Sequence, residues 1–289
     1  MLSPFLEAYL SEPRRQRVAL WLGDSGSRSK VSQTLLEMVR AGIHDLALDL
    51  TVFYGGGVEE LDTALTRQFP FAIRWLGADA AAESRFREIV AGGFDYALLF
   101  ESSGMYNGED AVNIAAPLAV GRLDAVWGSR RLSLRDIEAS LRVRYRHTPG
   151  LRFASTLGSH LLSAAYLVMY GRYISDTLSG VRAVRAGYLS LPGVRLDDKL
   201  LNQRLLSALL AERAEILETP VRFYAMSPAQ VRRTSIADGL QALTRILGWR
   251  LSGKTAHRDG LHARTAPEGV AHVPPADPLQ SRSRPQRPI

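Results

Sequence analysis

The sequence predicts an α/β fold with a mostly parallel sheet and helices on both faces. Two observations lead to this prediction. Between residues 17 and 130, apolar runs of strand length alternate with segments whose apolar residues recur at helical spacing, and this alternation is typical of parallel strands joined by helices. Four of the apolar runs also end in loops rich in Gly and Ser, and the carboxyl ends of parallel strands are where such sheets bind ligands.

The first predicted unit is a buried strand at 17–23, whose apolar run ends in a glycine and a loop of small residues. A helix follows at 31–42, where apolar residues recur at helical spacing and Gly42 provides a stop. The second strand, at 44–54, is closed by consecutive glycines. The same periodicities predict, in chain order, a helix at 58–69, a strand at 71–77, a helix at 78–93, a strand at 94–102, a helix at 109–122 and a strand at 123–130.

The second half of the chain has a different character. Residues 131–170 are rich in Arg and then become apolar and helical, whereas 174–191 combine features of loop and strand. Pro220 falls in an apolar segment and indicates an edge strand or a bulge there, because proline cannot donate a ladder hydrogen bond. The remaining predicted elements are an amphipathic helix at 199–214, a strand at 215–226 and a last helix at 235–251.

Composition indicates a folded chain with a disordered end. Of 289 residues, 46% are hydrophobic and 22% are charged, which excludes wholesale disorder and suits one catalytic-type domain. Beyond residue 252 there is no aromatic residue and there are six of the 14 prolines, so we expect a disordered tail. The expected parts are a lead-in at 1–16, a first half at 17–130, a second half at 131–252 and the tail at 253–289.

Several classes of site are excluded by what the sequence lacks. The chain contains no Cys, which excludes disulfides, zinc–thiolate sites, iron–sulfur clusters and a cysteine nucleophile. The loop LGDSGSRSK lacks the Gly-Lys-Ser/Thr ending of a P-loop, and there is no G-x-S-x-G nucleophile elbow. No apolar run approaches the length of about 18 residues that a membrane-spanning helix needs.

The basic residues indicate an anionic partner. The net charge of +7 comes from 36 Lys and Arg against 29 Asp and Glu, and the basic residues gather at 130–152 and 232–250. Almost all of them are Arg, which binds phosphate through two parallel hydrogen bonds. A phosphorylated substrate, an acidic membrane surface or nucleic acid would suit this charge. We expect no nucleic acid, because the chain has no helix-turn-helix, RNA-recognition or zinc-finger signature.

Four segments of the chain resemble family-2 glycosyltransferases of the polyprenyl- or dolichol-phosphate sugar transferase kind. The most specific is SDTLSGVRAVR at 175–185, which matches the pattern S-D-x-x-S-G-F-R-x-x-R with Val181 in place of Phe. The resemblance also includes GSR at 128–130, the Glu-x-Pro-Val element that begins at Glu218, and RRTSIADGLQAL at 232–243. It implies a GT-A fold in which the first half binds a nucleotide-diphosphate sugar and the second half binds the acceptor.

The resemblance implies catalytic roles for two residues: Asp176 near the reacting centre and Arg182 on phosphate. A capped turn is the alternative for Asp176, since Asp and Ser at such positions often bond to their own backbone. The expected contacts to donor and phosphates are Gly55, Gly56, Glu101, Ser103, Arg130, Arg131 and Ser179, and the expected acceptor contacts are Arg233 and Ser235.

The resemblance also implies a divalent ion, Mg²⁺ or Mn²⁺, on the donor diphosphate. The family's Asp-x-Asp-x-Gln motif falls here on Glu101, Ser103 and Met105. Such an ion prefers hard oxygen ligands, so Glu101 is the metal ligand that we expect and the Met105 thioether is the wrong chemistry. The family's Asp-Asp-Gly-Ser motif is replaced by VFYGGG, which has no carboxylate. Further carboxylates that could contribute from nearby are Asp24, Glu109 and Asp110.

Two functional hypotheses follow from the resemblance. In the first, the chain is a hexosyltransferase that moves a sugar from a nucleotide-diphosphate sugar to an acceptor such as a polyprenyl phosphate. In the second, it is a GT-A pseudoenzyme that acts as a binding or regulatory partner. Residues 157–173 are apolar and follow the Arg-rich run, which suits a membrane headgroup region and also suits a helix packed on the sheet. We expect a cytoplasmic protein that associates peripherally with the inner face of the membrane.

Overall fold

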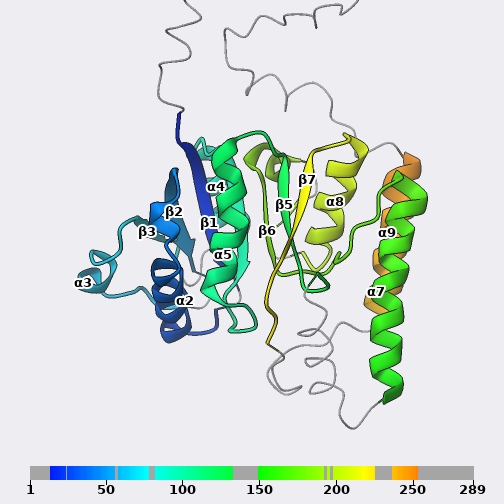
Figure 1. The fold of residues 1–289 in the computed structure, drawn as a ribbon, viewed down its shortest axis with the longest axis horizontal. Coiled ribbons are helices and arrows are strands. Elements are labelled where there is room, and N and C mark those ends of the chain that lie inside the picture. Colours follow the sequence, from blue (N-terminus) through cyan, green and yellow to red (C-terminus); the bar gives the residue numbers. More distant parts are fainter. Residues whose placement is uncertain are drawn as a thin grey trace, which may run out of the picture. The chain divides into compact units, whose positions relative to one another are not determined.

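Seven strands form one sheet in the computed structural model, which describes residues 14–23, 25–55, 58–77, 82–132, 149–191, 194–195, 198–224 and 236–252. The strand order is β3-β2-β1-β4-β6-β5-β7 (Figure 1). The strands are β1 (Gln16–Gly23), β2 (Leu48–Tyr54), β3 (Ala72–Trp75), β4 (Tyr96–Glu101), β5 (Ala125–Ser129), β6 (Val181–Arg185) and β7 (Ile216–Pro220).

The sheet is mostly parallel, as the sequence predicts, with one reversed strand. β1 runs parallel to β2 and β4, β2 to β3, and β5 to β7, while β6 is antiparallel to both β4 and β5. Arg182 of β6 pairs with Leu99 on one side and Trp127 on the other. Because β6 is reversed, the segment that precedes it reaches the sheet at the carboxyl ends of β4 and β5.

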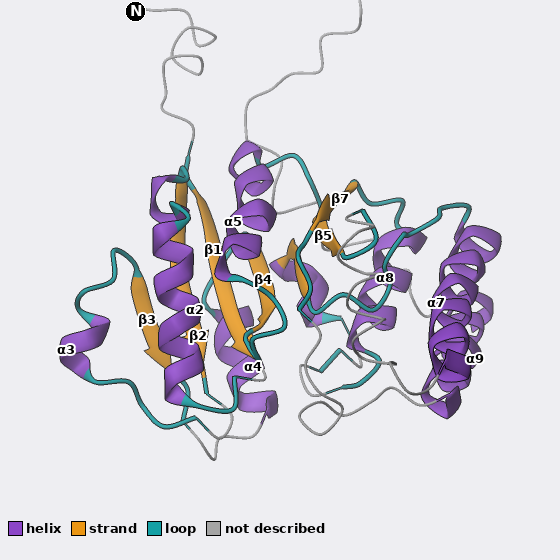
Figure 2. Cartoon of the chain, turned by 60° about the horizontal axis from the view of Figure 1, so that its bottom comes forward, coloured by secondary structure: helices purple, strands orange, loops and turns teal. Residues whose placement is uncertain are grey.

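Helices cover both faces of the sheet (Figure 2). On one face, α2 and α5 contact each other and bury Leu35 and Ile114 against alternate residues of the strands, such as Leu20 and Leu98. On the other face, the start of α8 lies beside Trp21 and Leu99. The helices are α2 (Arg28–Arg40), α3 (Thr63–Thr66), α4 (Ala82–Ala91), α5 (Gly108–Ala115), α7 (Pro149–Tyr170), α8 (Leu201–Ala211) and α9 (Ile236–Ser252).

Local signals explain where the helices of the core begin and end. Ser27 caps α2 by accepting a hydrogen bond from the Lys30 N–H, and Gly42 after the helix has φ +83°, which favours glycine. At α5, Asn107 and Asp110 form a reciprocal capping box. These caps fix the two helices that pack on β1 and β4.

Several predicted elements are shorter in the structure. The helix predicted at 58–69 is reduced to α3, and the strand predicted at 44–54 starts at Leu48 because Ile43–Asp45 form a 3₁₀ turn. The helix predicted at 109–122 ends at Ala115 and continues as a 3₁₀ turn that contains Pro117, which cannot donate the helical hydrogen bond. The strand predicted at 215–226 stops at Pro220, and β7 is an edge strand, as the proline indicates.

α7 and α9 lie side by side at one end of the sheet (Figure 2). α7 packs against α9 and α8. Within the described part of the chain, no helix is long and apolar enough to cross a membrane. The predicted tail at 253–289 and residues 1–13 of the lead-in lie outside the described residues.

Candidate functional site

A cleft of about 220 Å³ opens where β1 and β4 end and β6 begins. It brings together three residues that the sequence predicts, Glu101, Ser179 and Arg182, although they come from distant parts of the chain. It also includes residues at the start of α8 that sequence reasoning missed: Asp198, Lys199 and Asn202. This is the edge of a parallel sheet at which ligand sites are expected.

The guanidinium of Arg182 is held in a fixed position in the wall of the cleft. Its side chain is mostly buried, its guanidinium lies 5.7 Å from the centre of the Trp127 ring, and its Nη1 donates to the Ser179 carbonyl at 3.2 Å. Asn202 Nδ2 donates to the same carbonyl at 2.8 Å. The β6 and α8 side chains therefore hold the 179–180 loop between them.

Glu101, at the end of β4, bonds to the same loop. Its backbone N–H donates to the Gly180 carbonyl at 3.1 Å, and Ser103 Oγ donates to Glu101 Oε1 at 2.9 Å. The Gly180 N–H donates to the Tyr106 hydroxyl at 2.9 Å, and burial raises the pKa of Tyr106 to about 12. A Cβ at Gly180 would lie 2.3 Å from Glu101 Oε2, so the glycine of the 175–185 motif is required by close packing.

Asp176 forms a buried ion pair with Arg130. The guanidinium donates to the two carboxylate oxygens at 2.6 and 2.8 Å, and the Arg130 N–H adds a third bond at 3.1 Å. Burial alone would raise the pKa of Asp176, but the charge and hydrogen bonds of Arg130 outweigh it and hold the pKa below its ordinary value. The Leu178 N–H also donates to Asp176 at 3.2 Å, so the capped-turn alternative is present together with the ion pair.

The separate motifs of the resemblance meet around this pair. Ser175 Oγ lies 2.7 Å from Ser129 Oγ and donates to Glu218 Oε1 at 2.5 Å, and the Ser175 N–H donates to the same oxygen at 2.8 Å. The Trp127 indole N–H donates to the Asp176 carbonyl at 2.9 Å. The ends of β5 and β7 and the 175–180 loop are thus joined into one hydrogen-bonded unit.

Arg131 connects this unit to α7. Its guanidinium bonds His160 Nδ1 at 2.8 Å and the Ser159 hydroxyl, and its backbone N–H donates to Ser129 Oγ at 3.2 Å. Gly55 is buried directly after β2, at the same edge of the sheet as the cleft. The other residues predicted for donor or acceptor binding lie outside the described residues: Gly56, Arg233 and Ser235.

The side chains predicted to ligate a metal ion are mostly engaged elsewhere in the structure. Met105 packs in the hydrophobic core and its carbonyl accepts from the Tyr224 N–H, so its side chain faces away from a ligand. Glu109 and Asp110 hydrogen-bond to Arg222 instead, and Asp24 lies outside the described residues. Among the described residues, no three His, Asp or Glu side chains gather as a metal site.

Among the positions predicted for a metal, one carboxylate and one hydroxyl remain for a divalent ion. Glu101 and Ser103 hydrogen-bond to each other, and Glu101 lines the cleft. This donor set fits an ion such as Mg²⁺, which commonly takes one or two protein carboxylates and completes its shell with substrate phosphates and water.

The residues of α8 that sequence reasoning missed follow from the position of that helix. Asp198 Oδ1 accepts from the Leu200 N–H at 2.9 Å, and Lys199 Nζ lies 3.9 Å from an Asp238 oxygen on α9. The signal was a pair of charged residues directly before an amphipathic helix. Only the topology, which places the start of this helix at the carboxyl edge of β4, gives that signal a function.

Comparison with known proteins identifies the fold. No protein-family model matches the chain, and no curated protein matches it in sequence. Glucosyl-3-phosphoglycerate synthase from Mycobacterium tuberculosis, solved with uridine diphosphate, is 17% identical and superposes with a TM-score of 0.50 over 86% of this chain and 82% of that one. The chain has a GT-A-like fold. The fold prediction is therefore confirmed.

Two further solved structures are similar over comparable lengths. Mannosyl-3-phosphoglycerate synthase from Rubrobacter xylanophilus is 11% identical, with a TM-score of 0.46 over 89% of this chain and 79% of that one. A mannosyltransferase from Pyrobaculum calidifontis, in complex with GDP-Man and Mn²⁺, is 12% identical, with a TM-score of 0.43 over 85% and 69%.

Proposed function

We propose that this chain is a glycosyltransferase that moves a hexosyl group from a nucleotide-diphosphate sugar to an acceptor. The observation that carries the proposal is the cleft at the carboxyl edge of a GT-A-like sheet, in which Glu101, Arg182 and Lys199 converge. The solved structure with uridine diphosphate is of a protein with this fold and supports a nucleotide donor. The 175–185 motif next to the cleft supports the same reading.

In the proposed reaction, an acceptor oxygen bonds to the anomeric carbon while the bond from that carbon to the donor diphosphate breaks. The diphosphate leaves with the electron pair, so the site must stabilise negative charge. Arg182 is already fixed by Trp127 and Ser179 and lies in a largely buried position, so it acts without reorganisation. A bound Mg²⁺ or Mn²⁺ would neutralise further charge on the diphosphate, and Glu101 and Ser103 would hold it.

The two aspartates of the region take different roles in this proposal. Asp176 is occupied by Arg130 and its pKa is lowered, so it is a weak base that positions the guanidinium and the loop. Asp198 lines the cleft and is the carboxylate available to accept a proton from an acceptor hydroxyl. An acceptor phosphate is already ionised and needs no strong base.

The surface of α7 and α9 favours a lipid-phosphate acceptor. Val168 and Leu251 are each 81% exposed, and their helices lie side by side. Arg245 and Arg250 are exposed on α9, and basic side chains beside apolar ones suit an anionic membrane surface. The exposed apolar residues of the two helices are Leu157, Leu161, Leu167, Val168, Leu240, Leu247 and Leu251.

The membrane part of the proposal is tested by vesicle flotation. Val168→Asp combined with Leu251→Asp should abolish binding to vesicles that contain anionic lipid at low salt. Val120→Asp is the matched control, since Val120 is 68% exposed on the turn after α5. Equal binding by the wild type and both variants would exclude this surface.

The catalytic part is tested by a binding and turnover screen. Nucleotide-diphosphate sugars are titrated into the full chain with and without Mg²⁺ or Mn²⁺, and transfer is measured on a polyprenyl phosphate and on 3-phosphoglycerate. Arg182→Met should weaken donor binding, while Arg87→Met, on the exposed surface of α4, should leave it unchanged. Failure of every donor to bind would refute the proposal.

A pseudoenzyme is the second candidate, and the buried Met105 favours it. Two of the three metal-motif positions lack a carboxylate, and Met105 is packed in the core. The same screen separates the candidates: a pseudoenzyme binds a donor or partner but transfers no sugar to any acceptor with either metal present.

A further inference from the structure

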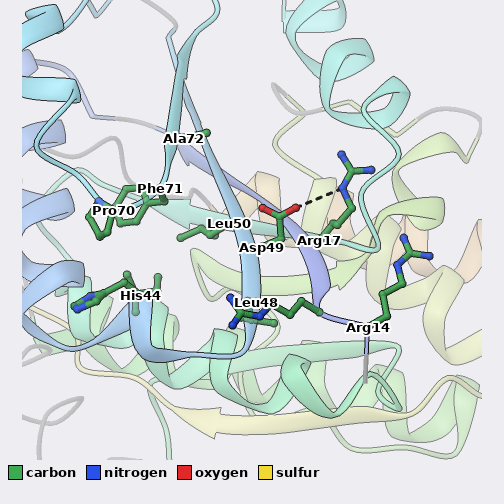
Figure 3. A pocket seen from close by; sticks show the side chains of 11 residues that line it. Arg14, Arg17, His44, Leu48, Asp49, Leu50, Pro70, Phe71 and Ala72 are labelled. Carbon is green, nitrogen blue, oxygen red and sulfur yellow. Dashed lines mark ion pairs between the residues drawn. The ribbon is translucent and has the colours of Figure 1, made fainter. Parts of the chain in front are cut away.

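A second cavity lies at the opposite edge of the sheet from the cleft. It has a volume of about 570 Å³ and is lined by residues that precede or begin β1, β2 and β3 (Figure 3). Because these three strands are parallel, their amino ends meet at one edge, whereas the cleft lies beyond the carboxyl ends of β1 and β4. The cavity is therefore separate from the proposed active site.

One part of this cavity is apolar. Ile43, Leu48 and Leu50 are buried side chains of the core that reach its wall. Pro70 and Phe71 come from the segment that leads into β3, and Figure 3 shows them across from His44. These surfaces can cover a short hydrocarbon or aromatic group.

The rest of the lining is mainly basic, with three arginines and one histidine. Arg14, Arg15, Arg17 and His44 line the cavity, and Asp49 is the one carboxylate among its lining residues that the structure describes. Arg17 Nε is 3.8 Å from Asp49 Oδ2 (Figure 3), and Asp49 is 63% exposed. Such a long, exposed ion pair is weak, and the single carboxylate of Asp49 leaves the three arginines of the lining in excess.

The three arginines at the start of β1 differ in how strongly other residues bind their side chains. Arg14 is 73% exposed and its Nη2 is 3.7 Å from Asp95. Arg17 Nη1 donates to the Gly93 carbonyl at 2.9 Å, and its guanidinium lies 5.2 Å from the centre of the Phe94 ring. Arg15 is exposed, and within the described part of the chain its side chain forms no ion pair or hydrogen bond. Arg15 is thus the guanidinium most available to an added anion.

We propose that this cavity is a second binding site for a free phosphate monoester that carries a short apolar group. The guanidinium groups suit a phosphate, which they bind through paired hydrogen bonds, and the apolar wall suits the organic group. A volume of about 570 Å³ falls in the range of metabolite-sized sites. The proposal does not depend on sugar transfer at the other edge of the sheet.

A calorimetric titration of the full chain tests both halves of this chemistry. Hexyl phosphate carries the charge and the apolar group, whereas inorganic phosphate and hexanol each carry one of them. Hexyl phosphate should bind at least about tenfold more tightly than either. Inorganic phosphate that binds as tightly as hexyl phosphate would overturn the proposal, because the apolar wall would then contribute nothing.

A charge-reversal variant tests whether the ligand binds in this cavity. Arg15→Glu should weaken hexyl phosphate binding by about tenfold or more, and uridine diphosphate should not displace the probe. Arg87→Glu, which changes an exposed arginine on α4 outside the lining, is the control and should bind as the wild type does. Unchanged affinity in Arg15→Glu, or displacement by uridine diphosphate, would refute the site.

The source of the phosphate is tested with vesicles. Phosphatidylcholine vesicles with and without phosphatidic acid are floated with the wild type and with Arg15→Glu. We expect the two proteins to behave alike, because a free ester is the proposed ligand. Loss of phosphatidic acid binding in Arg15→Glu alone would overturn the free ester in favour of a lipid head group.

Discussion

Asp176 and Asp110 are both almost fully buried, yet their pKa values move in opposite directions. Asp176, in the loop before β6, is 3% exposed and faces the guanidinium of Arg130 at 2.6 Å. Asp110, in the first turn of α5, is 1% exposed and accepts two backbone N–H groups. Burial raises the pKa of Asp110 to about 6, and its hydrogen bonds offset only part of the effect. An ionised partner, and not the degree of burial, decides which carboxylate stays charged.

The difference also separates two kinds of site. The Asp176 region holds its charges as a closed pair, which suits a scaffold that fixes the cleft. The Arg17–Asp49 pair at the other edge of the sheet is long and exposed, and it lies in the cavity where we propose that the neighbouring Arg15 binds an added anion. The same two residue types therefore form a framework in one place and line the proposed binding site in the other.

Removing the carboxylate of the Asp176–Arg130 pair should have the largest effect on stability. Asp176→Ala leaves the guanidinium of Arg130 buried without its carboxylate, which typically costs about 3–5 kcal/mol. Asp110→Ala removes a capping carboxylate whose charge is already disfavoured by burial at neutral pH, so it should cost no more than about 1 kcal/mol. Urea denaturation at neutral pH measures both. Equal losses in the two variants would show that the partner of the buried carboxylate does not matter.

The opposite pKa shifts predict opposite responses to pH. Because the pKa of Asp110 is raised from 3.8 to about 6, its contribution to stability is present below pH 3.8 and is lost as the pH rises through 6. Each unit of pKa difference corresponds to about 1.4 kcal/mol. Because the pKa of Asp176 is lowered, its contribution to stability is present at pH values above the ordinary pKa of Asp. This contribution is lost as the pH falls through the lowered pKa. Urea denaturation of wild type and Asp110→Asn across this range should show that the variant lacks the fall between pH 4 and 6.

A methyl group added at Gly180, in the loop that follows Asp176, should have a smaller effect on stability. Gly180→Ala places a Cβ 2.3 Å from Glu101 Oε2 and 2.9 Å from the Tyr106 ring, so it should cost about 1–3 kcal/mol and weaken donor binding. Gly158→Ala is the control, because nothing lies within 4 Å of a Cβ there and alanine favours a helix. Thermal unfolding compares the two. A Gly180→Ala protein as stable as Gly158→Ala would contradict the packing around the loop.

Neutralising the exposed pair should have the smallest effect. Asp49→Asn removes a weak ion pair with Arg17 and should change stability by less than about 0.5 kcal/mol. The same substitution should tighten hexyl phosphate binding, since it removes the carboxylate from the second cavity. A large loss of stability would mean that the two Arg–Asp pairs are alike in strength.

The sequence predicts the strands well because buried strands are continuous apolar runs. It also predicts the 175–180 loop, because each of two positions there suits one residue type. Asp176 supplies the carboxylate that pairs with Arg130, and Gly180 has no Cβ to clash with Glu101. It does not predict the reversal of β6, because strand direction depends on the path of the chain and not on local pattern. Lys199 is missed for the same reason, and the second cavity is missed because Arg14 and Arg15 lie in the predicted lead-in at 1–16, whereas Arg17 and His44 lie in predicted strands.

The position of β5 has a consequence for how the protein is made. β5 pairs with β6 and β7, and both of these strands are synthesised after it. A nascent chain that has not yet reached residue 181 leaves the apolar run of β5, including the fully buried Trp127, without its final neighbours. The first half is then exposed to aggregation during translation. Chaperone demand should therefore be greatest between the synthesis of β5 and that of β7.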